Sequence, residues 1–371
     1  SGPMGHVVVA KSPLPPDVEH SVLVCYRSAG LGVFGAIARY VGMPLEKVAL
    51  VMNSSQVSGS NQLAQAFRIT FAEGALAPYR VVGRASFVAW FMQYSVMGFV
   101  FQTCDSMLSR VFGVPRVLYG EELMLSAEQR EERRLAQQYE TRRLAAAGTR
   151  VTAKAEKAVD TSDAVTGTSS MAASGLGIAK AMLAPLLAGS IESVVANRAE
   201  VQRYFGITQF AKIEAQLNWN ALARLCGPAF VANASRNFIM SSTSFVISPL
   251  AFAYCFPQEQ KSRQSFFWFA LGVNVFVGNQ VAITQQALWG RACDYAAEGG
   301  GRNISYTTVV REAFKREGLS AFYTPAKWFT RVLMNAPAQG TLPFVYNEML
   351  PRGEDAVLNG AVAAYRALGF I

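Results

Sequence analysis

Two arginines that lie inside long apolar stretches, Arg39 and Arg236, are the side chains with the most obvious chemical potential. A charged side chain within a hydrophobic segment is costly, so it indicates a functional role by default. The alternative is that these arginines contact helix dipoles, lipid phosphates or a neighbouring subunit. The sequence leaves both interpretations open. Asn233 and Asn237 flank Arg236 and could share either role.

The chain has few residues that could support catalysis. The only histidines, His6 and His20, precede the first long apolar run. The five cysteines are scattered without CxxC spacing, and we interpret them as reduced packing residues: Cys25, Cys104, Cys226, Cys255 and Cys293. No GxxxxGK or GxSxG motif occurs. We therefore expect no enzymatic activity, no metal and no cofactor.

The composition is that of a membrane protein. Hydrophobic residues make up 51% of the 371 residues and charged residues only 16%, too few to cover a water-facing surface of this size. The net charge of +9 comes from Lys and Arg that cluster between apolar stretches. Membrane proteins distribute charge in this way, so the positive charge does not indicate a nucleic-acid partner.

Six apolar runs are long enough to cross a bilayer, and we expect an all-α protein with six transmembrane helices: 21–52, 79–104, 171–197, 221–256, 264–291 and 325–350. Residues 61–80 and 305–324 share an amphipathic helix followed by Glu-Gly, and 209–227 keeps only the helix. This self-similarity predicts three repeats, each with a helix on the membrane surface that ends at Gly74 or Gly318 in the two clearer copies.

A charged segment interrupts the repeats. Residues 110–170 interleave Glu and Arg at helical spacings and then become rich in Thr, Ser, Ala and Gly. Such a segment is either a solvated helix or a docking surface for a partner. The expected organisation is an N-terminal extension, carrier repeat 1, the helical insert, carrier repeats 2 and 3, and a tail helix: 1–20, 21–109, 110–170, 171–256, 257–350 and 351–371.

Over nearly its whole length apart from the insert and tails, the chain resembles the mitochondrial carrier family. Residues 306–348 resemble the second half of a family repeat, and GMPLEKVALVMN, after the span with Gly30, Gly32 and Gly35, resembles the family signature, most closely the ADP/ATP carrier version. The resemblance implies six tilted helices with pseudo-threefold symmetry in the mitochondrial inner membrane. It places the surface helices on the matrix side and the insert in the intermembrane space.

The family closes its cavity on the matrix side with a ring of salt bridges, and this chain lacks most of the charges. The ring positions hold Pro44, Glu46 and Ala49, then Ser190, Glu192 and Val195, then Val281, Ile283 and Gln286. The second ring falls near Phe101, Gln102, Ser248, Pro249, Tyr346 and Asn347, which carry no charge. Two acids without a base cannot form a ring, so we expect degenerate gates.

The family's substrate-contact positions are also altered. The resemblance places Trp90, Arg236 and Met334 at these positions, with Asn233 beside Arg236, and Arg39 where the ADP/ATP carriers have a cavity-facing Lys. Arg84 and Arg331 lie near span ends, where we expect them to snorkel.

These observations favour a degenerate carrier that has lost transport and serves as an accessory subunit of the respiratory chain or ATP synthase. Its expected partners are the other subunits and membrane lipids, including cardiolipin at matrix-side helix ends. The alternative is a divergent, active carrier for a small metabolite. A carrier should have a water-filled funnel reaching Arg39 and Arg236, whereas an accessory subunit should have that space plugged.

Overall fold

The computed structural model describes residues 14–52, 57, 61–80, 84–126, 128–133, 135–136, 175–205, 210–212, 226, 229–298 and 305–369. Within these ranges the secondary structure is helical throughout, without strands. Four helices are long and apolar enough to cross a membrane: Asp17–Val41, Gly175–Phe205, Phe230–Cys255 and Arg263–Glu298. The protein is therefore an all-α, multi-pass membrane protein.

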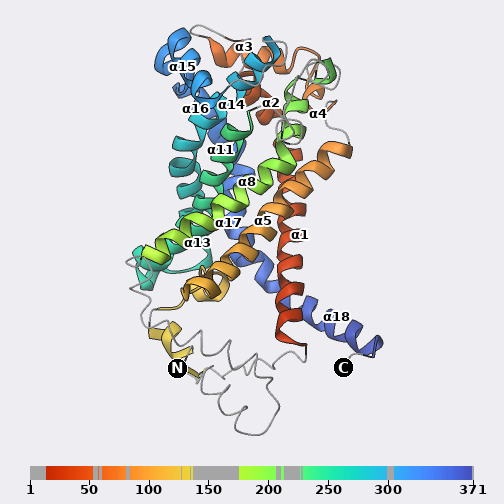
Figure 1. Cartoon of the computed structure of the whole chain (residues 1–371), viewed down its shortest axis with the longest axis vertical. Coiled ribbons are helices and arrows are strands. Elements are labelled where there is room, and N and C mark those ends of the chain that lie inside the picture. Colours follow the sequence, from red (N-terminus) through yellow and green to blue (C-terminus); the bar gives the residue numbers. More distant parts are fainter. Residues whose placement is uncertain are drawn as a thin grey trace.

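Six long helical runs form an elongated bundle (Figure 1). They are α1 (Pro16–Val41); α5 (Arg84–Phe112); α8 (Gly175–Phe205); α11 (Phe230–Ser242), η3 (Thr243–Ile247) and α12 (Ser248–Cys255); α13 (Arg263–Gly272), η5 (Val273–Gly278) and α14 (Asn279–Glu298); and α16 (Pro325–Asn335), η7 (Ala336–Gly340), α17 (Leu342–Phe344) and η8 (Val345–Met349). The expected spans 79–104 and 325–350 fall on α5 and on α16 to η8, which are not among the four apolar helices, so the six-span arrangement stays a prediction.

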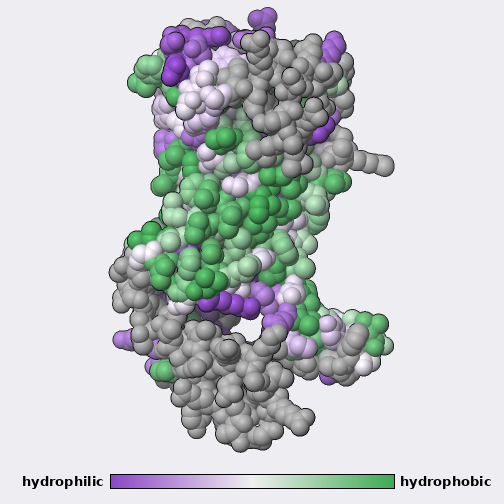
Figure 2. All heavy atoms as spheres, viewed as in Figure 1, coloured by the Kyte–Doolittle hydropathy of each residue, from purple (hydrophilic) through white to green (hydrophobic). Residues whose placement is uncertain are grey.

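Short helices mark the two ends of the bundle. The upper end in Figure 1 carries α2 (Met43–Met52), α3 (Gln62–Thr70), α4 (Ala77–Arg80) and α15 (Tyr306–Glu317). The lower end carries α18 (Glu354–Ala367), which packs against α1. Apolar residues gather over the middle of the visible face, and hydrophilic residues lie towards both ends (Figure 2). A lipid-facing belt between two polar ends is what a membrane-spanning bundle requires.

A break between α1 and α2 shapes the upper end. α1 ends at Val41, Gly42 caps it, and Pro44 lies in the first turn of α2. Proline is tolerated there because the first-turn N–H groups have no partner within the helix. The backbone N–H of Glu46 donates to the Gly42 carbonyl at 2.9 Å, and the Glu46 side chain is buried. The break thus directs the Glu46 side chain into the interior of the bundle.

A close contact between α8 and α11 depends on Gly189. A Cβ atom at this position would lie 2.5 Å from the backbone N of Phe238 and 2.8 Å from the carbonyl C of Asn237. Backbone cannot yield as a flexible side chain can, so Gly189→Ala should lower the free energy of unfolding by about 1–3 kcal/mol. Reversible unfolding in mixed micelles would measure the loss.

The matched control for this prediction is Gly272→Ala, within α13, where a Cβ atom would meet nothing within 4 Å. Alanine favours a helix interior over glycine by up to about 1 kcal/mol, so this variant should be neutral or more stable. Equal losses in the two variants would contradict the close packing of α8 on α11.

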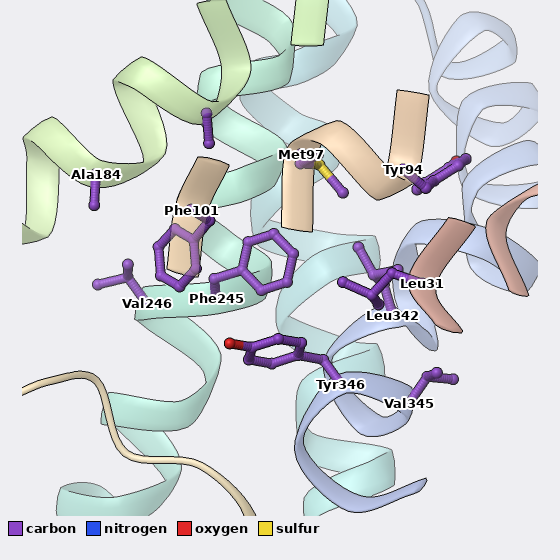
Figure 3. Packing of buried hydrophobic residues seen from close by; sticks show 11 residues of the cluster. Leu31, Tyr94, Met97, Phe101, Ala184, Phe245, Val246, Leu342, Val345 and Tyr346 are labelled. Atoms are coloured by element: carbon purple, nitrogen blue, oxygen red, sulfur yellow. The ribbon is translucent and has the colours of Figure 1, made fainter. Parts of the chain in front are cut away.

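A cluster of buried apolar side chains, here called the apolar plug, occupies the interior between the two ends (Figure 3). Phe101 and Phe245 stack with ring centroids 4.7 Å apart, and Tyr346 meets Phe245 edge-on at 5.1 Å. The plug comprises Leu31, Tyr94, Met97, Phe101, Ala184, Ala188, Phe245, Val246, Leu342, Val345 and Tyr346. These residues come from five of the six helical runs, so they fill the space that a funnel along the bundle axis would occupy.

Candidate functional site

A cavity lies above the apolar plug, towards the upper end. Its empty volume, including its opening, is about 360 Å³. The lining side chains come from five of the six long runs and from α2: Arg39, Glu46, Ala49, Leu50, Glu200, Arg203, Arg236, Gln286, Trp289, Arg331 and Met334. Along α1 the order from the lower end is Arg27, Leu31 and Arg39, which separates the cavity from the lower end by the plug.

Arg39 and Glu46 form the first ion pair of the cavity. Their side chains lie across the Gly42 break, with Arg39 Nη1 at 2.9 Å from Glu46 Oε2. Arg39 Nε also donates to the Tyr94 hydroxyl, at the upper edge of the plug, at 3.0 Å. Both partners of the pair are less than 10% exposed. A buried charge needs such a partner because desolvation alone would be too costly.

Arg236 is the hub of the second polar network. It donates to both Glu200 oxygens, at 3.0 and 3.2 Å, and to Gln286 Oε1 at 2.7 Å. Its remaining bonds go to Asn233 and Asn237 on its own helix, both at 3.0 Å. The network therefore links α8, α11 and α14. A guanidinium with this many acceptors is fully paired, which makes its burial tolerable.

The cavity carries more positive than negative charge. Its lining holds four arginines and two carboxylates, an excess of two positive charges. Arg331 is 4% exposed, reaches Gln286 Oε1 at 3.2 Å, and leaves its Nε without a hydrogen-bond partner in the described part of the chain. Arg203 lies over the Trp90 ring at 5.2 Å. Such an excess, held out of water, can bind a carboxylate or phosphate.

The structure brings most of the predicted site residues together. Arg39, Glu46, Arg236, Gln286 and Met334 line the cavity. The others lie around it. Asn233 is fully buried in the Arg236 network, and Trp90 is buried beneath Arg203. Glu192 accepts from Gln93 Nε2 at 2.6 Å outside the lining, and Pro44 lies in the first turn of α2.

One expectation is wrong. Arg331 does not snorkel to a span end, because it is buried and lines the cavity. The basic positions of the signature hold no base, but Arg39 pairs with Glu46 and Arg236 with Glu200 from positions outside that pattern. The side chain of Arg84, the other arginine expected to snorkel, lies outside the described residues.

Sequence reasoning missed three charged residues of the cavity, Glu200, Arg203 and Arg331. The spacing of two of them along the chain could have revealed them. Glu200 follows Glu192 by eight residues, and Arg203 follows Glu200 by three. These spacings place acids and base near one face of α8. Arg331 stands three residues before Met334, which would have indicated the same face of α16.

Ion pairs also tie the lower end together. Arg27 pairs with Glu354 at 2.5 Å, Lys180 with Asp105 at 2.8 Å, and Arg263 with Glu348 at 2.9 Å. None of these lies at the ring positions expected from the resemblance. The residues at those positions serve other purposes, as Phe101 and Tyr346 do in the apolar plug.

No protein-family model, curated protein or solved structure matches this chain. The fold and the site by themselves define its class as a multi-pass helical membrane protein. Its distinguishing features are a cation-rich internal cavity and an apolar plug below that cavity.

Proposed function

We propose that this chain is a carrier-like protein that no longer alternates between two conformations and serves as an accessory subunit of a mitochondrial inner-membrane complex. The observation that carries the proposal is the apolar plug. Phe101, Phe245 and Tyr346 are 2%, 1% and 6% exposed, so the axis between the cavity and the lower end is packed with side chains. A solute would need those rings to separate.

The energetics of opening support the same conclusion. Exposing one large apolar side chain to a water-filled path costs about 1.5–3 kcal/mol, and the plug contains three contacting rings. Alternating access requires two states within a few kcal/mol of each other. Opening either end must also break buried ion pairs between helical runs, such as Arg236 with Glu200 or Lys180 with Asp105. A single closed conformation fits these costs better than a cycle does.

Interhelical amide bonds add to this rigidity. Asn335 Nδ2 donates to Asn279 Oδ1 at 2.5 Å, and Asn274 bonds to Ser244 and Ser248 at 2.8 and 3.0 Å. Such bonds contribute roughly 0.6–2 kcal/mol each in a membrane. The resemblance of residues 306–348 to a carrier repeat supports the inner-membrane location. The complexes that we propose are those of the respiratory chain or ATP synthase.

Blue-native electrophoresis of gently solubilised mitochondrial membranes tests this proposal. The chain should migrate with a large respiratory or ATP-synthase complex and remain there after a moderate salt wash. Salt screens exposed charge contacts, so an association that depended on them alone would be lost in the wash. Migration as a free single chain in detergent would contradict the accessory role.

A second candidate, a carrier for a small organic anion or phosphate, is favoured by one observation, the excess positive charge of the cavity. Uptake of radiolabelled phosphate and dicarboxylates into proteoliposomes tests it. This candidate requires uptake above empty liposomes, with a large loss in Arg331→Gln. Absence of uptake for all these anions counts against it.

A further inference from the structure

Residues 114–126, here called the strap, follow the end of α5. They include η1 (Gly120–Leu123) and the turn after it. The strap lies against the helices at the lower end of the bundle. Its contacts reach both early and late helices of the chain. These contacts lie outside the cavity described above.

The first part of the strap is held between α5 and α8. The backbone N–H of Val117 donates to Asp105 Oδ2 at 3.2 Å. Lys180, which is 2% exposed, pairs with the other oxygen of Asp105 at 2.8 Å, and its Nζ also donates to the Pro115 carbonyl. One buried ion pair therefore fastens the strap to two helices.

Tyr119 holds the middle of the strap against α1. The Arg27 guanidinium lies over its ring at 4.1 Å and donates to its hydroxyl, while Arg27 Nε pairs with Glu354 of α18. The ring also faces Tyr346 of the apolar plug, with centroids 6.3 Å apart. Burial raises the pKa of the Tyr119 phenol. This contact joins the strap to both ends of the chain.

The last part of the strap reaches the middle helices. Leu123 is fully buried in an apolar cluster with Phe252 of α12 and Phe266 of α13. The Met124 carbonyl accepts from Gln258 Nε2 at 2.9 Å. Ser126 and Gln129 bond reciprocally to each other's backbone N–H, as in a capping box, which begins the next helical turn. The root of the charged segment is thus anchored to the bundle.

We propose that the strap is a latch that seals the lower end of the bundle by joining α1, α5, α8, α12, α13 and η8 in one closed arrangement. Any separation of these helices at the lower end must first break the strap's contacts, because each contact bridges to a different helix. The latch holds equally for a non-cycling subunit and for a carrier, so its test is independent of the proposed function.

A buried reporter can detect release of the latch. Ser106, which follows Asp105, is 4% exposed, and Ser106→Cys changes the side chain little. The reporter is placed in a chain with Cys25, Cys104 and Cys255 replaced by Ser, reconstituted in nanodiscs so that both ends face water. A membrane-impermeant maleimide then reports exposure through its labelling rate. Leu123→Ser and Lys180→Met should each raise that rate about tenfold, as expected when a local opening loses one buried contact of this strength.

The control variant is Arg263→Ala, which breaks an ion pair at the same end without touching the strap; the Arg263 side chain is 53% exposed. Its labelling rate should match that of the parent. Unchanged rates in both strap variants, or an equal rise in the control, would overturn the latch. Tyr119→Phe, which keeps the ring, should raise the rate by a smaller factor and covers the case in which a stronger variant fails to fold.

Discussion

Replacing Arg236 with Met is expected to lower the free energy of unfolding by about 3–5 kcal/mol, because Glu200 would stay buried without its cation. The loss should exceed that of an ordinary hydrogen bond, since Gln286, Asn233 and Asn237 also lose their charged donor. Reversible unfolding in mixed micelles, followed by tryptophan fluorescence, would measure it.

A second substitution separates the pair from the rest of the network. Glu200→Gln removes the orphaned charge, so the double variant should recover much of the loss and give a coupling energy of about 0.5–3 kcal/mol. Arg311→Met, at an exposed position of α15, is the matched control and should change stability by less than about 0.5 kcal/mol. Strict additivity of the two cavity substitutions would contradict the ion pair.

Phe245→Ala should cost about 3–5 kcal/mol, because it removes the ring at the centre of the apolar plug and leaves a cavity that the neighbours fill only partly. Phe245 is 1% exposed and touches both Phe101 and Tyr346. The same unfolding measurement applies. In proteoliposomes, leakage of small ions should rise in parallel, since the plug is packed between the cavity and the lower end.

Phe276 provides the matched control for the plug. It lies on η5 of the same protein but is 57% exposed on the apolar surface, so Phe276→Ala creates no internal cavity. Its effect should stay well below that of Phe245→Ala. Similar losses at the two positions would mean that the rings contribute through lipid contact and not through closure of the axis.

The sequence alone determined the helical class, the membrane environment and the approximate positions of the six helical runs. These features follow from local properties: the length of apolar runs, the position of Gly42 and Pro44, and the clustering of charge between runs. Arg39 and Arg236 were also evident, because a charged residue within an apolar stretch can be recognised from its sequence neighbours alone.

Only the tertiary structure decided which charges pair and what fills the axis. Arg236 meets Glu200 from a position 36 residues away, and Lys180 meets both Asp105 and the strap. Such pairs depend on how each helix is rotated and where it crosses its neighbours, and small shifts in either replace one partner with another. The plug has the same origin, because Phe101, Phe245 and Tyr346 are ordinary apolar residues until packing turns their rings towards one another.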